Sequence, residues 1–225
     1  MKIFVVGSGK LANALLNSGL SFPSCEMAQW ETGCSHLQGK AIVVHAGSGR
    51  QLEECIDFCS RTKSVFIELA TGLGTEKATP DFPLIICPNT SILVLKALQM
   101  VKANGKHFEG YDISITQSHQ TTKTTEPGTA FAFADSLKFP HQRIESVRDP
   151  LIQQSKIGIP AEYLGKHAYH RILIKDGDDE VTIVTKVLGH KSYANGVKKI
   201  IEMVLQHKLE NKKYTILELI GVGVL

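Results

Sequence analysis

The first half of the chain alternates between strand-like segments and helical patterns, and this alternation limits the possible folds more than any other feature of the sequence. Strands are predicted at residues 3–6, 26–30, 41–45, 65–69 and 84–87. The segment 3–6 is apolar throughout, which is typical of a strand buried on both faces of a parallel sheet. Helical spacing of apolar residues follows at residues 11–16, 50–62 and 91–103. This order favours a doubly wound, Rossmann-type sheet.

The pattern changes after Gly105. Polar and apolar side chains alternate at residues 111–117, 169–174 and 181–187. A turn at 176–179 separates the last two, and strands connected in this way pair as hairpins. A late helix is predicted at 193–207. The predicted fold class is therefore α/β: an N-terminal Rossmann-type dinucleotide-binding domain plus a C-terminal α+β domain with a mixed or antiparallel sheet, with the boundary near residues 89–90.

Composition and charge narrow the function classes. The chain has 225 residues, of which 43% are hydrophobic and 21% charged, as in ordinary soluble globular proteins. A formal net charge of +3 is too small to indicate a nucleic-acid partner, although it would not repel a small anionic substrate. The apolar run at residues 3–6 is too short for a signal peptide or a membrane span. We therefore expect no nucleic-acid partner and no membrane association.

The five cysteines indicate a reducing compartment. Their number is odd, and their spacing does not fit a metal site. Cys55 and Cys59 share a helical stripe with Leu52 and Ile56, which favours buried, reduced thiols over disulfides. A cytoplasmic location without a bound metal is the expectation.

Residues 7–12 form a G-x-G-x-x-A motif at the predicted first strand-to-helix turn. Gly7 permits the tight turn, Gly9 lets the backbone approach a pyrophosphate, and Ala12 lets the helix pack closely on the strand. The position of the motif favours dinucleotide binding over a purely structural turn. Glu31, after the second strand, is the candidate to bind the adenosine ribose. The alternative for Glu31 is a solvated loop carboxylate.

Residues 117–130 form a second candidate site, because they leave an alternating strand, cross a polar loop and enter a helix near Thr129. His119 can supply a proton near neutral pH, and Lys123 offers a fixed positive charge. The turn at Gly128 and Thr129 presents backbone N–H groups and a hydroxyl that suit a carboxylate. A reductase that delivers hydride to an unsaturated dicarboxylate needs these parts. The alternative is a capped helix behind a loop with a surface histidine and lysine.

The same segment resembles the signature of the 4-hydroxy-tetrahydrodipicolinate reductase (dihydrodipicolinate reductase) family, roughly E-x-H-H-x-x-K-x-D-x-P-S-G-T-A. Four further segments are similar to family motifs in the same order. Residues 70–73 are similar to the G-T-T-G-F turn and residues 87–91 to the A-P-N-F-S hinge. Residues 165–167 and 193–196 are similar to the G-E/D-H step and the F-A-x-G helix opening. The resemblance thus covers both halves of the chain.

The resemblance implies a cytoplasmic, homotetrameric oxidoreductase of the diaminopimelate and lysine pathway. Such an enzyme uses NADH or NADPH to reduce 4-hydroxy-tetrahydrodipicolinate, a small anionic dicarboxylate, to tetrahydrodipicolinate. The family fold implies that residues 1–90 and 194–225 form the dinucleotide-binding domain. Residues 91–193 would then form the domain for substrate binding and oligomerisation.

Individual residues carry the implied roles. His119 corresponds to the family's proton donor, and Lys123 to the residue for substrate binding and charge stabilisation. Gln120, Gly128 and Thr129 would contact the substrate. The implied cofactor-binding residues are Gly7, Gly9, Lys10, Leu11, Glu31, Ala70, Thr71, Gly72, Asn89 and Thr90. Glu31 can accept a hydrogen bond from a ribose 2′-hydroxyl but would repel a 2′-phosphate, so NADH is favoured over NADPH. Lys40 and Arg50 are the cations that could approach the same position in space.

The chain also departs from the family pattern. The family's glutamate, second histidine and aspartate are replaced by Gln117, Gln120 and Thr125. The serine before Gly128 is missing, which shortens the anion-binding turn, and His45 stands where the family has an aspartate. Two alternatives stay open: a related reductase of a different imine or keto acid, and a catalytically silent dinucleotide-binding protein. Retention of His119 and Lys123 argues against the silent protein.

Overall fold

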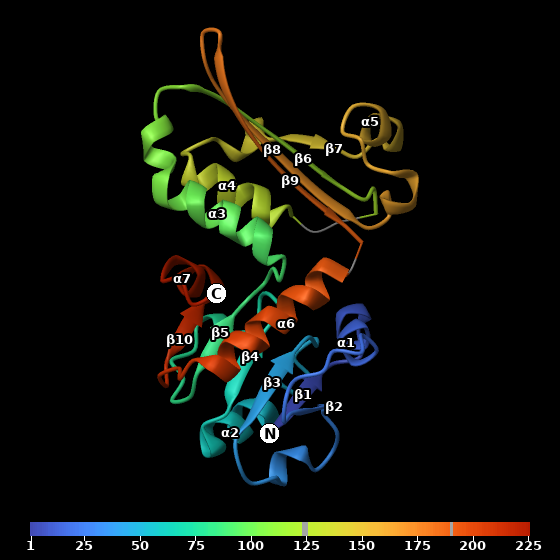
Figure 1. Cartoon of the computed structure of the whole chain (residues 1–225), viewed down its shortest axis with the longest axis vertical. Coiled ribbons are helices and arrows are strands. Elements are labelled where there is room, and N and C mark those ends of the chain that lie inside the picture. The colour runs from blue at the N-terminus through green and yellow to red at the C-terminus, as the bar shows by residue number, and fades with distance from the viewer. Residues whose placement is uncertain (123–125, 190) are drawn as a thin grey trace. The chain divides into compact units, whose positions relative to one another are not determined.

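The computed structural model describes residues 1–122, 126–189 and 191–225. The chain divides into two compact units, each with a sheet of its own (Figure 1). The first unit comprises Met1–Ile92 and Tyr193–Leu225, and the second comprises Leu93–Ser192.

The sheet of the first unit is parallel in every strand pair of the described residues. Its strands are β1 (Lys2–Val6), β2 (Glu26–Gln29), β3 (Ala41–His45), β4 (Val65–Glu68), β5 (Leu84–Ile86) and β10 (Lys213–Thr215). They lie in the order β10-β5-β4-β3-β1-β2, so β2 and β3 flank β1 on opposite sides. All five residues of β3 are buried, as expected for a strand covered on both faces. The predicted Rossmann-type sheet is confirmed.

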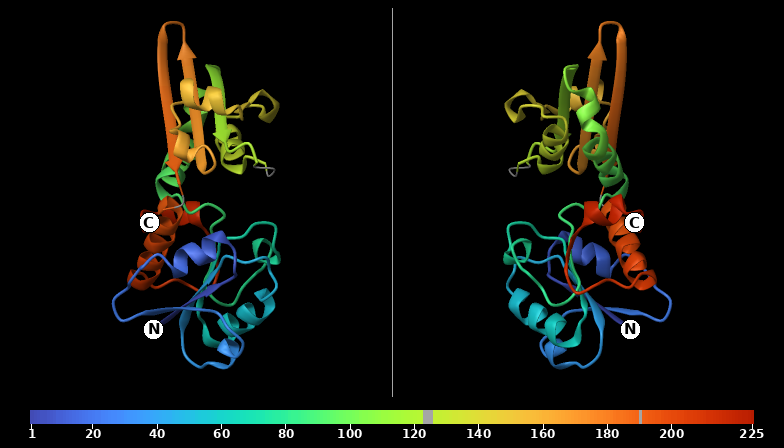
Figure 2. Two further views of the ribbon diagram at one scale, coloured as in Figure 1. Left: turned by 90° about the vertical axis from the view of Figure 1, so that its right-hand side faces the viewer. Right: turned by 90° about the vertical axis from the view of Figure 1, so that its left-hand side faces the viewer.

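Helices cover both faces of this sheet. They are α1 (Lys10–Leu16), α2 (Leu52–Thr62), α6 (Lys191–Gln206) and α7 (Ile216–Gly221). Figure 2 shows α2 on one side of the strands and α1 with α6 on the other. Phe58 of α2 meets Phe4 and Trp30 edge to face, with ring centroids 6.3 and 5.4 Å apart. The late helix therefore belongs to the first unit and buries Val197 and Ile200 there.

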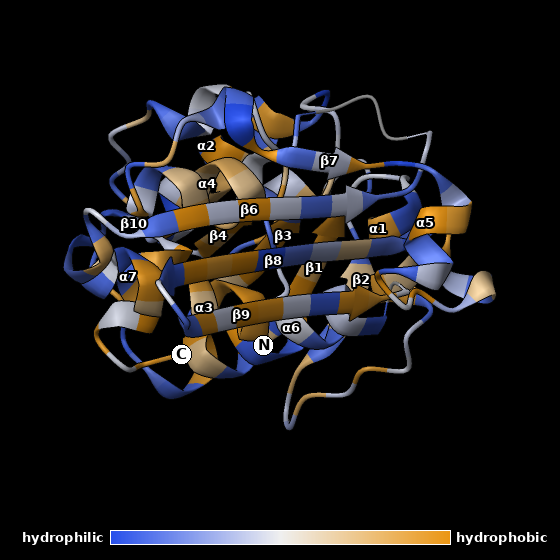
Figure 3. Ribbon diagram, turned by 90° about the horizontal axis from the view of Figure 1, so that it is seen from above, coloured by the Kyte–Doolittle hydropathy of each residue, from blue (hydrophilic) through white to orange (hydrophobic). Residues whose placement is uncertain are grey.

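The second unit has a mixed sheet, as predicted. Its strands are β6 (Asp112–His119), β7 (Glu145–Val147), β8 (His167–Asp176) and β9 (Asp179–Leu188), in the order β7-β6-β8-β9. β8 is antiparallel to both β6 and β9, whereas β7 is parallel to β6. The helices of this unit are α3 (Ile92–Asn104), α4 (Gly128–Ser136) and α5 (Pro150–Ser155). Figure 3 views the face of the sheet away from α3 and α4, where hydrophobic segments run along β8 and β9.

The structure differs from the predicted elements mainly at their ends and in the shortest strands. β6 continues past the predicted end at residue 117 to His119. α2 begins at Leu52 instead of residue 50, because the Leu52 N–H donates to Gly49, whose φ of 91° belongs to a turn. β7, β10, α5 and α7 were not predicted, since segments this short leave too few positions for a periodic pattern.

The remaining segments are short 3-10 turns and loops. The turns are η1 (Cys34–His36), η2 (Gly74–Glu76), η3 (Gly105–Phe108), η4 (His141–Arg143) and η5 (Ala161–Tyr163). All five cysteines are free thiols, but Cys25 and Cys34 are only half-buried, contrary to the expectation of buried thiols. Burial raises the pKa of Cys55 and Cys87 to about 12. Within the described ranges, every helix is too short or too polar to cross a membrane.

Candidate functional site

A pocket of about 650 Å³ lies at the carboxyl ends of β1, β2 and β3 in the first unit. Open α/β sheets bind ligands at this edge, at the point where the strand order reverses. The walls are Val6, Gly7, Ser8, Gly9, Gln29, Trp30, His45, Ala46, Gly47, Ser48, Arg50 and Gln51. Two of the predicted cofactor-binding residues, Gly7 and Gly9, are among them.

The two glycines of the first turn act differently. Gly7 has a φ of 119°, and a Cβ there would lie 2.7 Å from the Ala46 carbonyl oxygen. Only glycine fits this position, because the turn passes directly against the residue after β3. Gly9 is the N-cap of α1 with a φ of −77°, and a Cβ there would meet nothing within 4 Å. Open space above Gly9 is what a ligand approaching the backbone requires.

His45 and Glu68 form a buried pair at the wall of this pocket. They end the neighbouring strands β3 and β4, and 2.7 Å separates His45 Nδ1 from Glu68 Oε1. The Glu68 carboxylate also accepts from the Ala70 N–H and the Thr75 hydroxyl. His45 Nε2 has no hydrogen-bond partner in the part of the chain that the structure describes. An open cradle beside an unpaired polar atom fits an oxygen-rich ligand such as a dinucleotide.

The other predicted cofactor-binding residues also follow strand ends, but the pocket walls do not include them among the described residues. They are Lys10, Leu11, Glu31, Ala70, Thr71, Gly72, Asn89 and Thr90. Glu31 is exposed just beyond β2. Thr90 is buried, and its hydroxyl donates to the Tyr193 carbonyl at 2.9 Å. A Cβ on Gly196 would collide with the Thr90 carbonyl, so Thr90 also fixes the close approach of α6.

The second candidate site is built around His119 at the end of β6. His119 is only 7% exposed, and its Nδ1 lies 2.7 Å from Gln117 Oε1. An amide oxygen can only accept, so His119 Nδ1–H donates this hydrogen bond. Gln117 Nε2 donates to the Ser146 hydroxyl at 2.6 Å, which holds the amide in this orientation.

Arg148 and Gln153 also contact this histidine, and the sequence patterns did not single them out. Arg148 Nη1 lies 3.3 Å from Gln117 Oε1 and 3.4 Å from the His119 carbonyl oxygen. Gln153 Nε2 donates to the same carbonyl at 2.9 Å. The sequence signal in this region was Asp149-Pro150, in which Asp149 caps α5 and Pro150 is its first residue, so the preceding segment ends at Arg148.

A second buried histidine lies beside this site. His167 Nδ1 donates to the carbonyls of Tyr163 and Leu164, both at 3.1 Å, and Nε2 accepts from the Ser118 hydroxyl at 2.9 Å. Burial lowers the pKa of His167, and the nearby Arg148 charge acts in the same direction. His167 is therefore a neutral residue that fixes β8 against β6.

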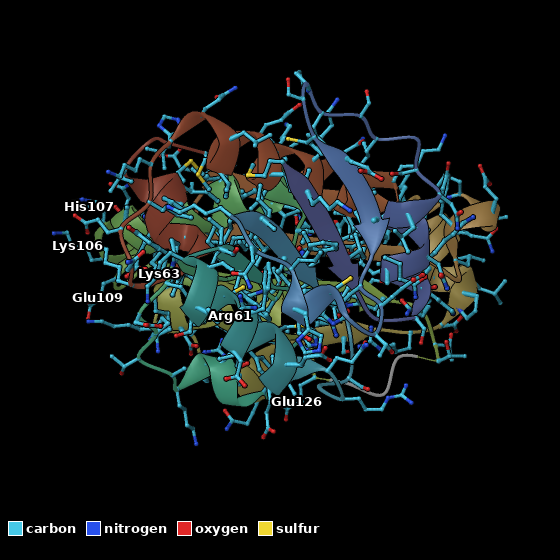
Figure 4. All side chains as sticks on the ribbon, turned by 90° about the horizontal axis from the view of Figure 1, so that it is seen from below. Arg61, Lys63, Lys106, His107, Glu109 and Glu126 are labelled. Atoms are coloured by element: carbon cyan, nitrogen blue, oxygen red, sulfur yellow. The ribbon has the colours of Figure 1, made fainter. Side chains whose placement is uncertain are left out.

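The predicted substrate-binding residues lie on either side of residues 123–125, which are outside the described residues. Gln120 follows His119 and is half-buried, and Gly128 begins α4. The Gly128 N–H donates to the carbonyl of Glu126, an exposed residue labelled in Figure 4, and Thr129 follows in the first turn of α4. Lys123 and Thr125 lie outside the described residues, as does His190. No group of three potential metal ligands occurs among the residues that the structure describes.

The family is shown by a match that covers the second unit and continues into the first. The sequence profile described as "Dihydrodipicolinate reductase, C-terminus" matches residues 93–220, more than half of the chain. The chain belongs to this family. The resemblance seen in the sequence motifs is thereby confirmed.

Curated relatives carry the same family name. The probable 4-hydroxy-tetrahydrodipicolinate reductase 1, chloroplastic, of Oryza sativa subsp. japonica is 29% identical over 126 residues, which cover 52% of this chain and 37% of the relative. The chain spans about a third of the length of the plant relatives that it matches. The 4-hydroxy-tetrahydrodipicolinate reductase of Rickettsia bellii (strain OSU 85-389) is 23% identical over 210 residues, covering 84% of this chain and 82% of the relative.

A solved structure shares the fold of the family. It is a dipicolinate-bound dihydrodipicolinate reductase from Paenisporosarcina sp. TG-14, with a TM-score of 0.67 and 15% sequence identity. The similarity covers 97% of this chain and 98% of that chain. At this identity the likeness concerns the fold, and the predicted fold class is confirmed by it.

Proposed function

We propose that this protein is an NAD(P)H-dependent oxidoreductase that reduces 4-hydroxy-tetrahydrodipicolinate to tetrahydrodipicolinate. The observation that carries the proposal is the setting of His119, a nearly buried histidine within the family signature. Its Nδ1–H is held by Gln117, which fixes the ring, and Nε2 would be the nitrogen that exchanges a proton with a substrate. The names of the relatives support the same reaction.

The first unit would hold the nicotinamide dinucleotide. The tight turn at Gly7, the open space above Gly9 and the polar wall at His45 support this role. Residues 7–11 would bind the pyrophosphate, and residues 70–72 and 89–90 would lie near the nicotinamide. When bound, the reduced nicotinamide supplies a hydride. The chain's own task is to hold that ring in a fixed orientation and to keep water away from it.

NADH is the cofactor that we propose to be preferred. Glu31 is exposed after β2, where a carboxylate can accept from the adenosine ribose and repels a 2′-phosphate. Arg50 lines the pocket and is the cation that could weaken this preference. Steady-state kinetics with both cofactors test the assignment. A strong advantage of NADPH in kcat/KM would refute it.

The second unit would bind the substrate and supply the proton. Reduction of this substrate takes up one hydride and one proton and releases one water molecule. His119 would donate the proton through Nε2, and Lys123 would stabilise negative charge as it develops. Gln120, Gly128 and Thr129 would contact the substrate, of which Thr129 and Gly128 stand at the start of α4, where a carboxylate is favoured.

The wider setting follows from the proposed reaction, which belongs to the diaminopimelate and lysine pathway of the cytoplasm. The partners would be a small anionic dicarboxylate and further copies of the chain, in a homotetramer, with no nucleic acid and no membrane. The resemblance to the family supports this assembly. Sedimentation equilibrium measures the number of copies directly.

A reductase of a different imine or keto acid is the second candidate. The observation that favours it is the neutral pair Gln117 and Gln120 at positions where the family has charged residues. Cofactor oxidation followed at 340 nm, first with enzymatically generated 4-hydroxy-tetrahydrodipicolinate and then with a panel of cyclic imines and keto acids, separates the two. A kcat/KM that is highest for a substrate other than the dicarboxylate would replace the first proposal with the second. Absence of turnover with every substrate would support the silent protein.

A further inference from the structure

Arg148 is a cation beside His119 to which the proposed reaction gives no role. It lies between β7 and α5 and is half-buried. Its Nη1 reaches Gln117 Oε1 at 3.3 Å and the His119 carbonyl at 3.4 Å, long hydrogen bonds to neutral acceptors. It forms no ion pair with a carboxylate among the described residues. A partly desolvated guanidinium without a counter-ion is costly, and such a group is suited to an anionic ligand.

A hydrogen bond to the backbone of Arg148 holds this residue in place. The Thr121 hydroxyl donates to the Arg148 carbonyl at 3.0 Å, which ties it to the loop after His119. The adjacent carboxylate of Asp149 forms no ion pair with the described Arg148 side chain, and Asp149 Oδ1 accepts from the Leu151 N–H at 2.8 Å as the N-cap of α5. Burial lowers the pKa of Arg148, yet a guanidinium remains charged at neutral pH.

The α4 turn lacks one of the donors of the family pattern. The Gly128 N–H is already used by the Glu126 carbonyl, and the serine that precedes this glycine in the family is missing. A dicarboxylate brings two carboxylates to the site. The start of α4 suits one of them, so the other needs donors elsewhere, and the guanidinium beside His119 has donors to offer.

We propose that Arg148 binds one carboxylate of the dicarboxylate substrate. This inference rests on the proposed function and names the residue that recognises the substrate class. The planar guanidinium can donate two parallel hydrogen bonds to a carboxylate, a geometry that a lysine cannot match. Gln117 connects Arg148 to His119, so the carboxylate and the proton donor would be held in one hydrogen-bonded network. A ligand with a single carboxylate would use only part of this site.

The test compares two probes, dipicolinate and picolinate, which differ by one carboxylate. Calorimetry on the full-length protein gives the ratio of their affinities. We expect the wild type to favour dipicolinate about 10- to 100-fold, the range of a charge-assisted hydrogen-bonded pair. Arg148→Gln should reduce that ratio to about twofold, the statistical advantage of two equivalent groups. Arg143→Gln, the same change at an exposed arginine of η4, should leave the ratio unchanged.

The outcomes are distinct. If Arg148→Gln weakens both probes equally, or neither, the residue serves only to hold Gln117 and His119, and the inference is wrong. If the wild type binds neither probe, the dicarboxylate assignment in the proposed function fails together with the inference. Should Arg148→Gln fail to fold, a crystal structure of the wild type with dipicolinate decides. A carboxylate within hydrogen-bond distance of the Arg148 guanidinium supports the inference, and a carboxylate bound elsewhere overturns it.

Discussion

Gln117 holds His119 by one ring nitrogen, with 2.7 Å between Oε1 and Nδ1. The amide is itself held, since its Nε2 donates to the Ser146 hydroxyl. A neutral amide orients the imidazole without adding a negative charge, whereas the family pattern has a glutamate at this position. Gln117 therefore fixes the orientation of the proposed proton donor without placing a negative charge beside it.

Replacing this amide by a carboxylate should alter the pH dependence of the reaction. Gln117→Glu puts a negative charge against the His119 ring, which favours the imidazolium and raises the pKa of His119 in the variant. The donor then stays protonated to higher pH, so the basic limb of the kcat profile should move upward by about one pH unit or more. Gln154→Glu, the same change at an exposed position of α5, is the control and should leave the profile in place. Superimposable profiles for the Gln117 variant and the wild type would contradict this role.

The two proposed catalytic residues should differ in their kinetic effects. His119→Gln should lower kcat by about 10²–10⁴-fold with little change in KM, the usual scale of general acid catalysis. Lys123→Ala should lower kcat and also raise KM, because its charge acts on the bound substrate as well as during the reaction. Both variants should bind NADH with wild-type affinity, since neither residue belongs to the first unit. Turnover close to the wild-type value in either variant would remove that residue from the mechanism.

The fold of the first unit could be predicted largely from local sequence patterns. The site around His119 could be predicted only in part. The segment from residue 3 to residue 16 has an apolar strand, two glycines and a helical stripe, and each of these is visible in a short window. The contacts around His119 are different, because Arg148 and Gln153 reach it across 29 and 34 residues of sequence. The His45–Glu68 pair likewise depends on the register of β3 against β4. No periodic pattern encodes such pairings.

The two glycines of the first turn offer a matched pair of variants. Gly9→Val puts a side chain into open space, so the protein should melt at the wild-type temperature but lose affinity for the dinucleotide. Gly7→Ala meets the Ala46 carbonyl at 2.7 Å and a positive φ, so it should lower the melting temperature as well. Calorimetry with NADH and thermal unfolding measure the two effects. Unchanged NADH affinity in Gly9→Val would show that the site assignment is wrong.

His167 should make the protein sensitive to acid. Because burial lowers the pKa of His167, the unfolded chain takes up a proton at a pH where the folded protein does not. The stability that depends on neutral His167 is therefore complete above about pH 6.5, the ordinary histidine value, and is lost as the pH falls toward the lower folded-state value. His167→Gln should be less stable than the wild type at pH 7.5, and the difference should narrow at pH 5.5. Urea unfolding at both values tests this, and a constant difference would count against it.

The proposed function requires that hydride passes from a nicotinamide dinucleotide to the dicarboxylate on this chain. The most direct measurement uses NADH carrying deuterium at the transferred position of the nicotinamide, with enzymatically generated 4-hydroxy-tetrahydrodipicolinate as substrate and mass spectrometry of the product. We expect tetrahydrodipicolinate that is one mass unit heavier and formed in equal amount to the NADH oxidised. Product without deuterium from NADH labelled at either face, or no product from a protein that binds both ligands, would contradict it.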